Sequence, residues 1–136
     1  MTSNKKWILL YIPAFLWAVL IFLLLTLPPQ TFEDESVSVI PQFDKIVHAG
    51  LFGAMVFWLA LPLAKRYSSS SKILIWFTIA SSLYGCAMEF VQKYCTSDRD
   101  FDVWDMVADT VGAILSYFCM RYIFNQYQKK KNIQIA

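Results

Sequence analysis

Long apolar runs alternate with short polar segments along the chain. The apolar runs occupy about residues 7–27, 45–64, 73–94 and 103–124. Each is close to the roughly 20 residues that an α-helix needs to cross a bilayer. The first run carries no charge, and the charges of the third and fourth lie toward one end. The pattern therefore predicts four membrane-spanning helices.

The polar segments predict how these helices are joined. Residues 28–43 form an acidic loop that begins with Pro28-Pro29, and short polar turns lie at 65–72 and 95–101. Short connections favour antiparallel neighbours. The first run is longer than the apolar region of a signal peptide, about 7–15 residues, so we expect it to be retained. We predict one domain, residues 1–136: an all-α integral membrane four-helix antiparallel bundle with a basic tail at 125–136.

The charged residues separate by sign between the two ends of this bundle. Nine of the twelve basic residues fall at one set of helix ends: Lys5, Lys6, Lys65, Arg66, Lys72, Arg121, Lys129, Lys130 and Lys131. All ten acidic residues fall at the other set or in its loops. Basic residues mark the cytoplasmic side of membrane proteins. Both termini are therefore predicted to be cytoplasmic, and the acidic end is predicted to face outward.

The composition agrees with a membrane protein. Hydrophobic residues make up 57% of the 136 positions and charged residues 16%, against about 25% charged residues in a typical soluble domain. This balance excludes a disordered chain and a nucleic-acid-binding arm. The three cysteines show no CxxC spacing, which excludes a disulfide framework and a thiolate zinc site.

Ionisable residues gather at the predicted outer ends of the last three helices. The second run opens with Asp44, Lys45 and His48, and the third closes with Glu89, Gln92 and Lys93. The loop that follows holds Asp98, Arg99 and Asp100, and the fourth helix opens with Asp102, Asp105 and Asp109. Charged residues within a membrane are costly, so they mark functional sites by default.

Helical phase predicts that these residues face one another. Asp102, Asp105 and Asp109 share one face of the fourth helix, which Gly112 and Ser116 continue. Small residues on a helix allow another membrane helix to approach closely. On the third helix, Gly85, Glu89 and Gln92 share a face, and on the second Lys45, His48 and Phe52 do. The three faces are therefore expected to converge inside the bundle.

The charges of this cluster do not balance. Seven acids accompany three bases and one histidine. We expect Glu89 to pair with Lys93, Lys45 to reach Asp109 or Glu89, and Arg99 to clamp Asp102 or Asp105. The remaining acids are expected to be protonated, to face water or to bind a cation.

The same residues form a pattern on consecutive helices. It reads Asp44-Lys45-x-x-His48, then Tyr84-Gly85-x-x-x-Glu89-x-x-Gln92, then Arg99-x-x-Asp102-x-x-Asp105-x-x-x-Asp109-x-x-Gly112. Over roughly residues 43–118 this resembles the VanZ-like family of small bacterial membrane proteins. The family usually has Asn where Asp109 stands and Gly where Ser116 stands. The resemblance implies a multi-pass protein of the bacterial cytoplasmic membrane, in a family named for an accessory factor of teicoplanin resistance.

Each candidate residue has a structural and a functional interpretation. His48 is either a packing residue paired with Asp44, or a metal ligand or general acid/base. Glu89 and Asp105 are either partners of Lys93 and Arg99 or functional carboxylates. No cofactor is predicted, although His48, Glu89 and Asp105 are the candidates for a divalent cation. The residues predicted to bind a ligand are Asp44, Lys45, His48, Glu89, Gln92, Arg99, Asp102, Asp105 and Asp109.

Three functions fit this sequence. The first is binding of an envelope lipid or cell-wall precursor headgroup, with Arg99, Lys45 and Lys93 on phosphate and the acids and Gln92 on sugar or amine groups. The second is an enzyme that uses Glu89 and Asp105 on such a lipid. The third is a non-catalytic bundle that acts through partner proteins. The expected partners are membrane lipids, not nucleic acid.

Overall fold

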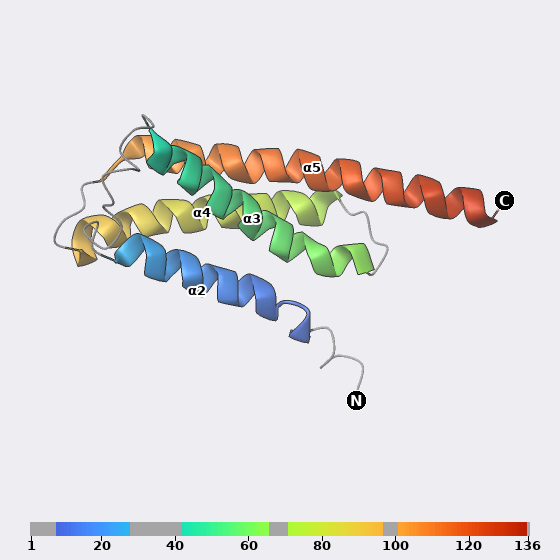
Figure 1. Cartoon of the computed structure of the whole chain (residues 1–136), viewed down its shortest axis with the longest axis horizontal. Helices are drawn as coiled ribbons and strands as arrows, with labels where there is room; N and C mark the ends of the chain where they lie inside the picture. The colour runs from blue at the N-terminus through green and yellow to red at the C-terminus, as the bar shows by residue number, and fades with distance from the viewer. Residues whose placement is uncertain (1–7, 28–41, 66–70, 97–100, 136) are drawn as a thin grey trace.

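The helices of the chain confirm the all-α fold. The computed structural model describes residues 8–27, 42–65, 71–96 and 101–135. Its helices are α2 (Ile12–Thr26), α3 (Phe43–Lys65), α4 (Ser71–Cys95) and α5 (Val103–Ile135). Consecutive helices run in opposite directions, and the two ends of the described chain lie at the same end of the bundle (Figure 1).

Among the described residues, three helices are long and apolar enough to cross a membrane: α3, α4 and α5. The first predicted span forms a shorter regular helix than its apolar run suggests, because α2 begins only at Ile12 with Pro13 in its first turn. Proline favours this position because the first backbone N–H groups of a helix have no partner inside it. Leu27 is extended, as a residue before proline prefers. At 15 residues, α2 spans only about 22 Å.

The last helix is longer than predicted. We expected a span of about 103–124 and then a tail, but α5 continues to Ile135 and projects past the end of α3 (Figure 1). The stretch contains Gln, Lys and Asn with no Gly or Pro. Gln and Lys are good helix formers, and nothing in the stretch stops the helix.

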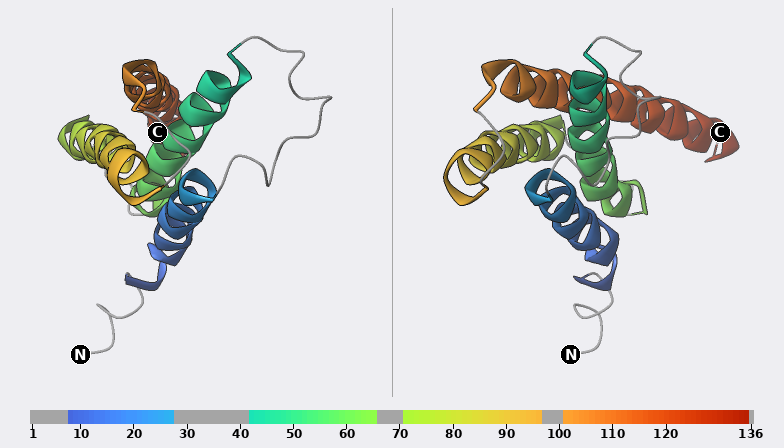
Figure 2. Two further views of the ribbon diagram at one scale, coloured as in Figure 1. Left: turned by 90° about the vertical axis from the view of Figure 1, so that its left-hand side faces the viewer. Right: turned by 60° about the vertical axis from the view of Figure 1, so that its left-hand side comes forward.

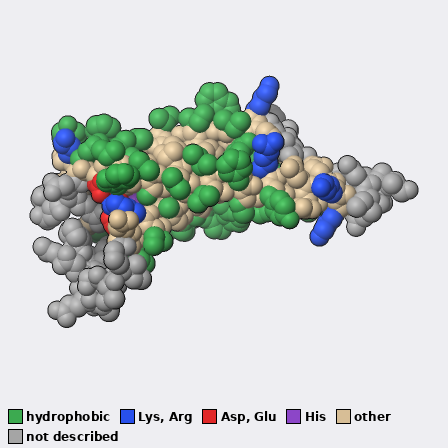
Figure 3. All heavy atoms as spheres, turned by 90° about the horizontal axis from the view of Figure 1, so that it is seen from above, with side chains coloured by type: hydrophobic (Ala, Val, Ile, Leu, Met, Phe, Trp, Pro, Cys, Tyr) green, Lys and Arg blue, Asp and Glu red, His purple; other side chains and the backbone are tan. Residues whose placement is uncertain are grey.

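The bundle is apolar outside and partly polar inside, the reverse of a soluble domain. Large hydrophobic side chains such as Phe15, Leu83 and Leu115 are exposed. Hydrophobic side chains cover the middle of the face in Figure 3, whereas acidic and histidine side chains show only at one end of it. The buried polar side chains are His48, Ser81, Glu89, Gln92 and Asp109. Exposed apolar surface on this scale marks contact with lipid.

The closest helix contact joins α3 to α5, and small residues make it possible. A Cβ atom on Gly112 would collide with the backbone carbonyl of Ala49, and one on Gly53 would lie 3.0 Å from the carbonyl oxygen of Gly112. The backbones therefore touch, as the predicted small-residue face of the last helix requires. This contact sets the spacing of the two helices that carry most of the ionisable residues.

Helix α2 packs against α3 and α4, and Figure 2 shows it beside α3 and away from α5. Three hydrogen bonds, at different positions along its length, attach α2 to these two helices. The Trp17 indole N–H donates to the carbonyl of Leu51 (2.9 Å), the Tyr84 hydroxyl to that of Ala18 (2.8 Å), and the Gln92 amide to that of Leu25 (3.0 Å). The Leu25 carbonyl lies in the last turn of α2, where it lacks an intrahelical donor.

Candidate functional site

The ionisable residues meet at the end of the bundle where α3 and α5 begin and α4 ends. We call the following residues the polar cluster: Asp44, Lys45, His48, Glu89, Asp102, Asp105 and Asp109. They lie within the first two turns of α3, the last two turns of α4, and the start of α5 with the residue before it. Three helices contribute side chains, and the predicted convergence of their faces is confirmed.

Lys45 organises the outer layer of the polar cluster. Its ammonium lies 2.9 Å from a carboxylate oxygen of Asp44, 2.9 Å from one of Asp102 and 3.1 Å from one of Asp105. The Lys45 side chain is 25% exposed, and that of Asp44 is 58% exposed. One cation therefore offsets part of the charge of three acids at the rim of the bundle.

Asp102 joins the rim to the start of α5. Its side chain accepts a hydrogen bond from the backbone N–H of Trp104 at 2.8 Å, so it is the N-cap of the helix. The Lys45 ammonium and this N–H hold the pKa of Asp102 below its ordinary value. This cap was not predicted from the sequence, although an Asp just before the fourth apolar run is the usual signal for one.

The inner layer centres on a buried histidine–carboxylate pair. His48 Nδ1 lies 2.9 Å from a carboxylate oxygen of Asp109, and His48 Nε2 lies 3.8 Å from a carboxylate oxygen of Asp105. The side chain of His48 is 5% exposed and that of Asp109 1%. The imidazole is therefore fixed between two carboxylates one turn apart on α5.

Glu89 completes the inner layer from α4. One of its oxygens accepts the backbone N–H of Asp102 at 3.1 Å. Its second oxygen, Oε1, is buried without a hydrogen-bond partner, and so is Oδ2 of Asp109. A buried carboxylate oxygen without a donor is costly, so each of these atoms calls for a partner that the described side chains do not supply.

Gly85 leaves space for this arrangement. A Cβ atom at this position would lie 2.8 Å from the Cβ atom of Asp109, closer than such atoms approach in proteins. The absence of a side chain therefore allows Asp109 to lie directly against α4. The predicted common face of Gly85 and Glu89 on the third helix has this geometric role.

Several predicted pairings are wrong. Lys45 contacts the outer acids and not Glu89 or Asp109, and His48 pairs with Asp109 and not with Asp44. No ion pair joins Glu89 to Lys93 within the described residues, because Glu89 points inward whereas the Lys93 ammonium lies over the rings of Tyr94 and Phe101, 5.5 and 5.4 Å from their centroids.

Of the predicted ligand-binding residues, Gln92 has a different set of contacts and Arg99 is not among the described residues. Gln92 donates from its amide nitrogen to the carbonyl of Leu25, which gives it a structural role in holding α2. Its contact with a ligand stays a prediction. Arg99 falls outside the described residues, and so do Asp98 and Asp100.

The polar cluster therefore combines a partly neutralised rim with an acid-rich interior. Asp105 lies between the two layers, because one of its oxygens faces Lys45 and the other faces His48. Five acids surround one lysine and one histidine. Such a site suits a partner with positive charge or with hydrogen-bond donors, since the acceptors outnumber the donors.

Comparison with known families gives a match over most of the chain. A family model described as VanZ/LLP1 matches residues 8–125, a stretch that includes α2 to α4, most of α5 and the whole polar cluster. No curated protein and no solved structure matches the chain. Because the family model covers most of its length, the chain belongs to the VanZ/LLP1 family of membrane proteins.

Proposed function

We propose that this chain is a multi-pass protein of the bacterial cytoplasmic membrane that binds the headgroup of an envelope lipid or a lipid-linked cell-wall precursor. The observation that carries the proposal is the position of the polar cluster: an acid-rich group, partly exposed at its rim, at one end of a bundle whose outer surface is apolar. Lipid headgroups lie at the two surfaces of a membrane, where the ends of membrane-spanning helices are found.

The distribution of basic residues supports an outward-facing site. Lys72 lies in the first turn of α4, and Arg121, Lys129 and Lys130 lie in the second half of α5, at the end opposite the polar cluster. Basic residues favour the cytoplasmic side. The polar cluster then faces the outer leaflet, where cell-wall precursors are used.

The charge of the rim indicates which part of a headgroup it meets. We expected Lys45 to bind phosphate, but three carboxylates already surround its ammonium. The rim acids Asp44 and Asp102 are 58% and 39% exposed, and they accept hydrogen bonds. We therefore propose that they bind an amine or the hydroxyls of a sugar, and that Lys93 lies on the phosphate side of the same headgroup.

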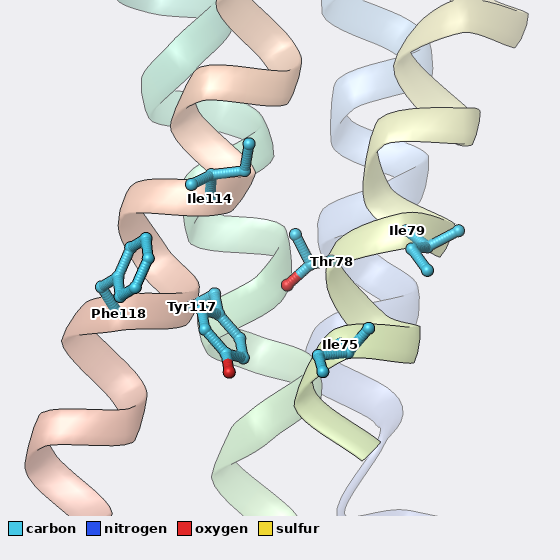
Figure 4. Close-up of a pocket in the computed structure, with 6 residues that line it drawn as sticks. All are labelled: Ile75, Thr78, Ile79, Ile114, Tyr117 and Phe118. Carbon is cyan, nitrogen blue, oxygen red and sulfur yellow. The ribbon is translucent and has the colours of Figure 1, made fainter. Parts of the chain in front are cut away.

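An apolar groove offers a place for the acyl chain. It has a volume of about 240 Å³ and lies between α4 and α5, lined by Ile75, Thr78, Ile79, Ile114, Tyr117 and Phe118 (Figure 4). At 1.5 Å per residue, these positions lie roughly 14–21 Å along the helices from Glu89 and Asp105. A chain attached to a headgroup at the rim reaches this depth.

Lipid retention tests the proposal. The protein is purified gently from bacterial membranes in the presence of a metal chelator, and its lipids are quantified by mass spectrometry. We expect the wild type to retain an amine- or sugar-bearing lipid above its membrane abundance. The Asp44→Asn/Asp102→Asn variant should lose this enrichment about tenfold for each of its two lost charge-assisted hydrogen bonds, because each loss weakens binding by about 1.5 kcal/mol or more.

A matched control neutralises two charges at the opposite end. The Lys129→Gln/Lys130→Gln variant alters exposed residues of α5 far from the rim and should retain lipid like the wild type. Retention of bulk lipids in their membrane proportions by the wild type, or equal loss in both variants, would contradict headgroup recognition at the polar cluster.

An enzyme acting on such a lipid is the second candidate, and the His48–Asp109 pair favours it. A carboxylate on Nδ1 fixes the imidazole so that Nε2 is available for proton transfer, and Glu89 and Asp105 lie beside it. A link to teicoplanin resistance belongs to the same proposal. A bundle that acts only through partner proteins would need no such arrangement.

Susceptibility and abundance measured together separate these functions. In a strain where this chain changes teicoplanin susceptibility, we expect Glu89→Gln and Asp105→Asn to reach the membrane in normal amounts and to lose the phenotype. The exposed Lys72→Gln variant at the other end serves as the control. Product formation from the retained lipid that requires Glu89 would identify an enzyme. An unchanged phenotype in both variants would exclude a working role for these carboxylates.

A further inference from the structure

The inner layer of the polar cluster has the geometry of a cation site. His48, Glu89 and Asp105 each offer one ligand atom, and these three atoms lie within 4.8 Å of one another. They come from three different helices, α3, α4 and α5. His48 and Glu89 are buried and Asp105 is half-buried, so the group is enclosed by the bundle and opens toward the rim through Asp105.

The orientation of His48 suits coordination. Its Nδ1 faces Asp109 at 2.9 Å, and its Nε2 faces the Asp105 carboxylate at 3.8 Å. Metal-binding histidines commonly donate one ring N–H to a carboxylate, which fixes the tautomer and directs the other nitrogen at the ion. Asp109 occupies this orienting position, and it is not one of the three ligand residues.

A second observation is the buried oxygen atoms that lack partners. Glu89 is 1% exposed and its Oε1 has no hydrogen-bond partner. The Glu89 carboxylate is one of the three groups whose ligand atoms lie within 4.8 Å of one another. A cation bound there would satisfy it, whereas no described donor does.

The outer layer contains a similar group that needs no added ion. Asp44, Asp102 and Asp105 each offer one carboxylate oxygen, and these three oxygens also lie within 4.8 Å of one another. The Lys45 ammonium, however, contacts all three carboxylates. Among the described residues, Lys45 supplies a cation to the rim, and no lysine or arginine ion pair reaches the interior. This contrast places the added ion in the inner layer.

We propose that His48, Glu89 and Asp105 bind one divalent cation of the Zn²⁺ or Mn²⁺ class, with Asp109 orienting the imidazole. A single imidazole with two carboxylates suits these ions, whereas Mg²⁺ and Ca²⁺ prefer oxygen ligands alone. Three protein ligands leave a coordination position open. The inference rests on this chain's own side chains and goes beyond the headgroup proposal.

Metal titration of lipid-free protein tests the site. The wild type in detergent is stripped with a chelator and titrated separately with Zn²⁺, Mn²⁺, Mg²⁺ and Ca²⁺. We expect one Zn²⁺ or Mn²⁺ per chain with micromolar or tighter affinity, and at least about tenfold weaker Mg²⁺ and Ca²⁺. Pulsed electron paramagnetic resonance of the Mn²⁺ form should show coupling to one imidazole nitrogen.

Matched variants locate the ion. His48→Gln should abolish the nitrogen coupling and weaken binding about 100-fold, and Asp109→Asn should weaken it about 10–100-fold through the loss of orientation. Asp44→Asn removes an acid from the rim only and should bind as the wild type does. Circular dichroism confirms that each variant keeps its helices.

Two results would overturn the proposal. The first is wild-type protein that binds none of the four ions with a Kd below about 100 μM. The second is binding that Asp44→Asn abolishes and His48→Gln preserves, which would assign the ion to the rim. Both tests use the protein without lipid, and lipid retention is measured with chelator present, so the two proposals fail separately.

Discussion

Replacement of Gly112 by alanine is expected to destabilise the bundle by about 1–3 kcal/mol, as overpacking of a tight interface does. The added Cβ atom would collide with the carbonyl of Ala49 on α3, and a backbone atom cannot move aside as a side-chain tip does. The two helices must separate or rotate. Because His48 precedes Ala49 and Asp109 lies one turn before Gly112, the variant should also weaken the histidine–carboxylate pair.

Gly50→Ala is the matched control for this prediction. A Cβ atom on Gly50 would have nothing within 4 Å, and alanine is a better helix former than glycine by about 1 kcal/mol. The free energy of unfolding in mixed micelles should therefore fall for Gly112→Ala and stay equal or rise for Gly50→Ala. Equal stability of the wild type and Gly112→Ala would show that the α3–α5 interface is looser than described.

Lys45→Met is expected to cost about 2 kcal/mol, a value between that of an exposed ion pair and that of a buried one. The change keeps the length of the side chain and removes the ammonium that contacts Asp44, Asp102 and Asp105. Three carboxylates then face one another without a cation. Addition of Asp105→Asn should restore part of the loss, because it removes one of the repelling charges.

The loss of stability in Lys45→Met is also expected to depend on pH in a definite direction. The Lys45 contact lowers the pKa of Asp102 from 3.8, so its stabilisation is full above about pH 4 and is lost as the pH falls through the lowered value. The difference in stability between wild type and variant should therefore shrink in acid. Lys93→Met is the control, because the Lys93 ammonium lies over aromatic rings. A difference that grows in acid would contradict the proposed role of Lys45.

Helical periodicity was sufficient to predict which residues face the interior. The common face of Glu89 and Gln92 is buried, and Asp109 is buried where the phase of the last helix places it. The position of these residues near the helix ends also followed from where they stand in the apolar runs. Both properties depend on one helix at a time, which is why the sequence determines them.

The partners of each charge could not be predicted in the same way. A contact between helices depends on their relative height and rotation, which the α3–α5 backbone contact at Gly112 fixes. Lys45 lies nearly one turn outside His48, so it reaches the rim acids, and His48 reaches Asp109. The ion pair predicted from the i,i+4 spacing of Glu89 and Lys93 is wrong, because the buried Glu89 side chain instead accepts a hydrogen bond from the backbone N–H of Asp102.

The attachment of α2 has a consequence for how this protein can change during evolution. The acceptors at Ala18 and Leu25 are carbonyl oxygens, which every amino acid supplies, and seven residues separate them, nearly two helical turns. Apolar substitutions along α2 preserve both bonds. Insertion of one residue between these positions turns the following carbonyl by about 100° and breaks one of them. Selection should therefore conserve the length of this segment more strictly than its composition.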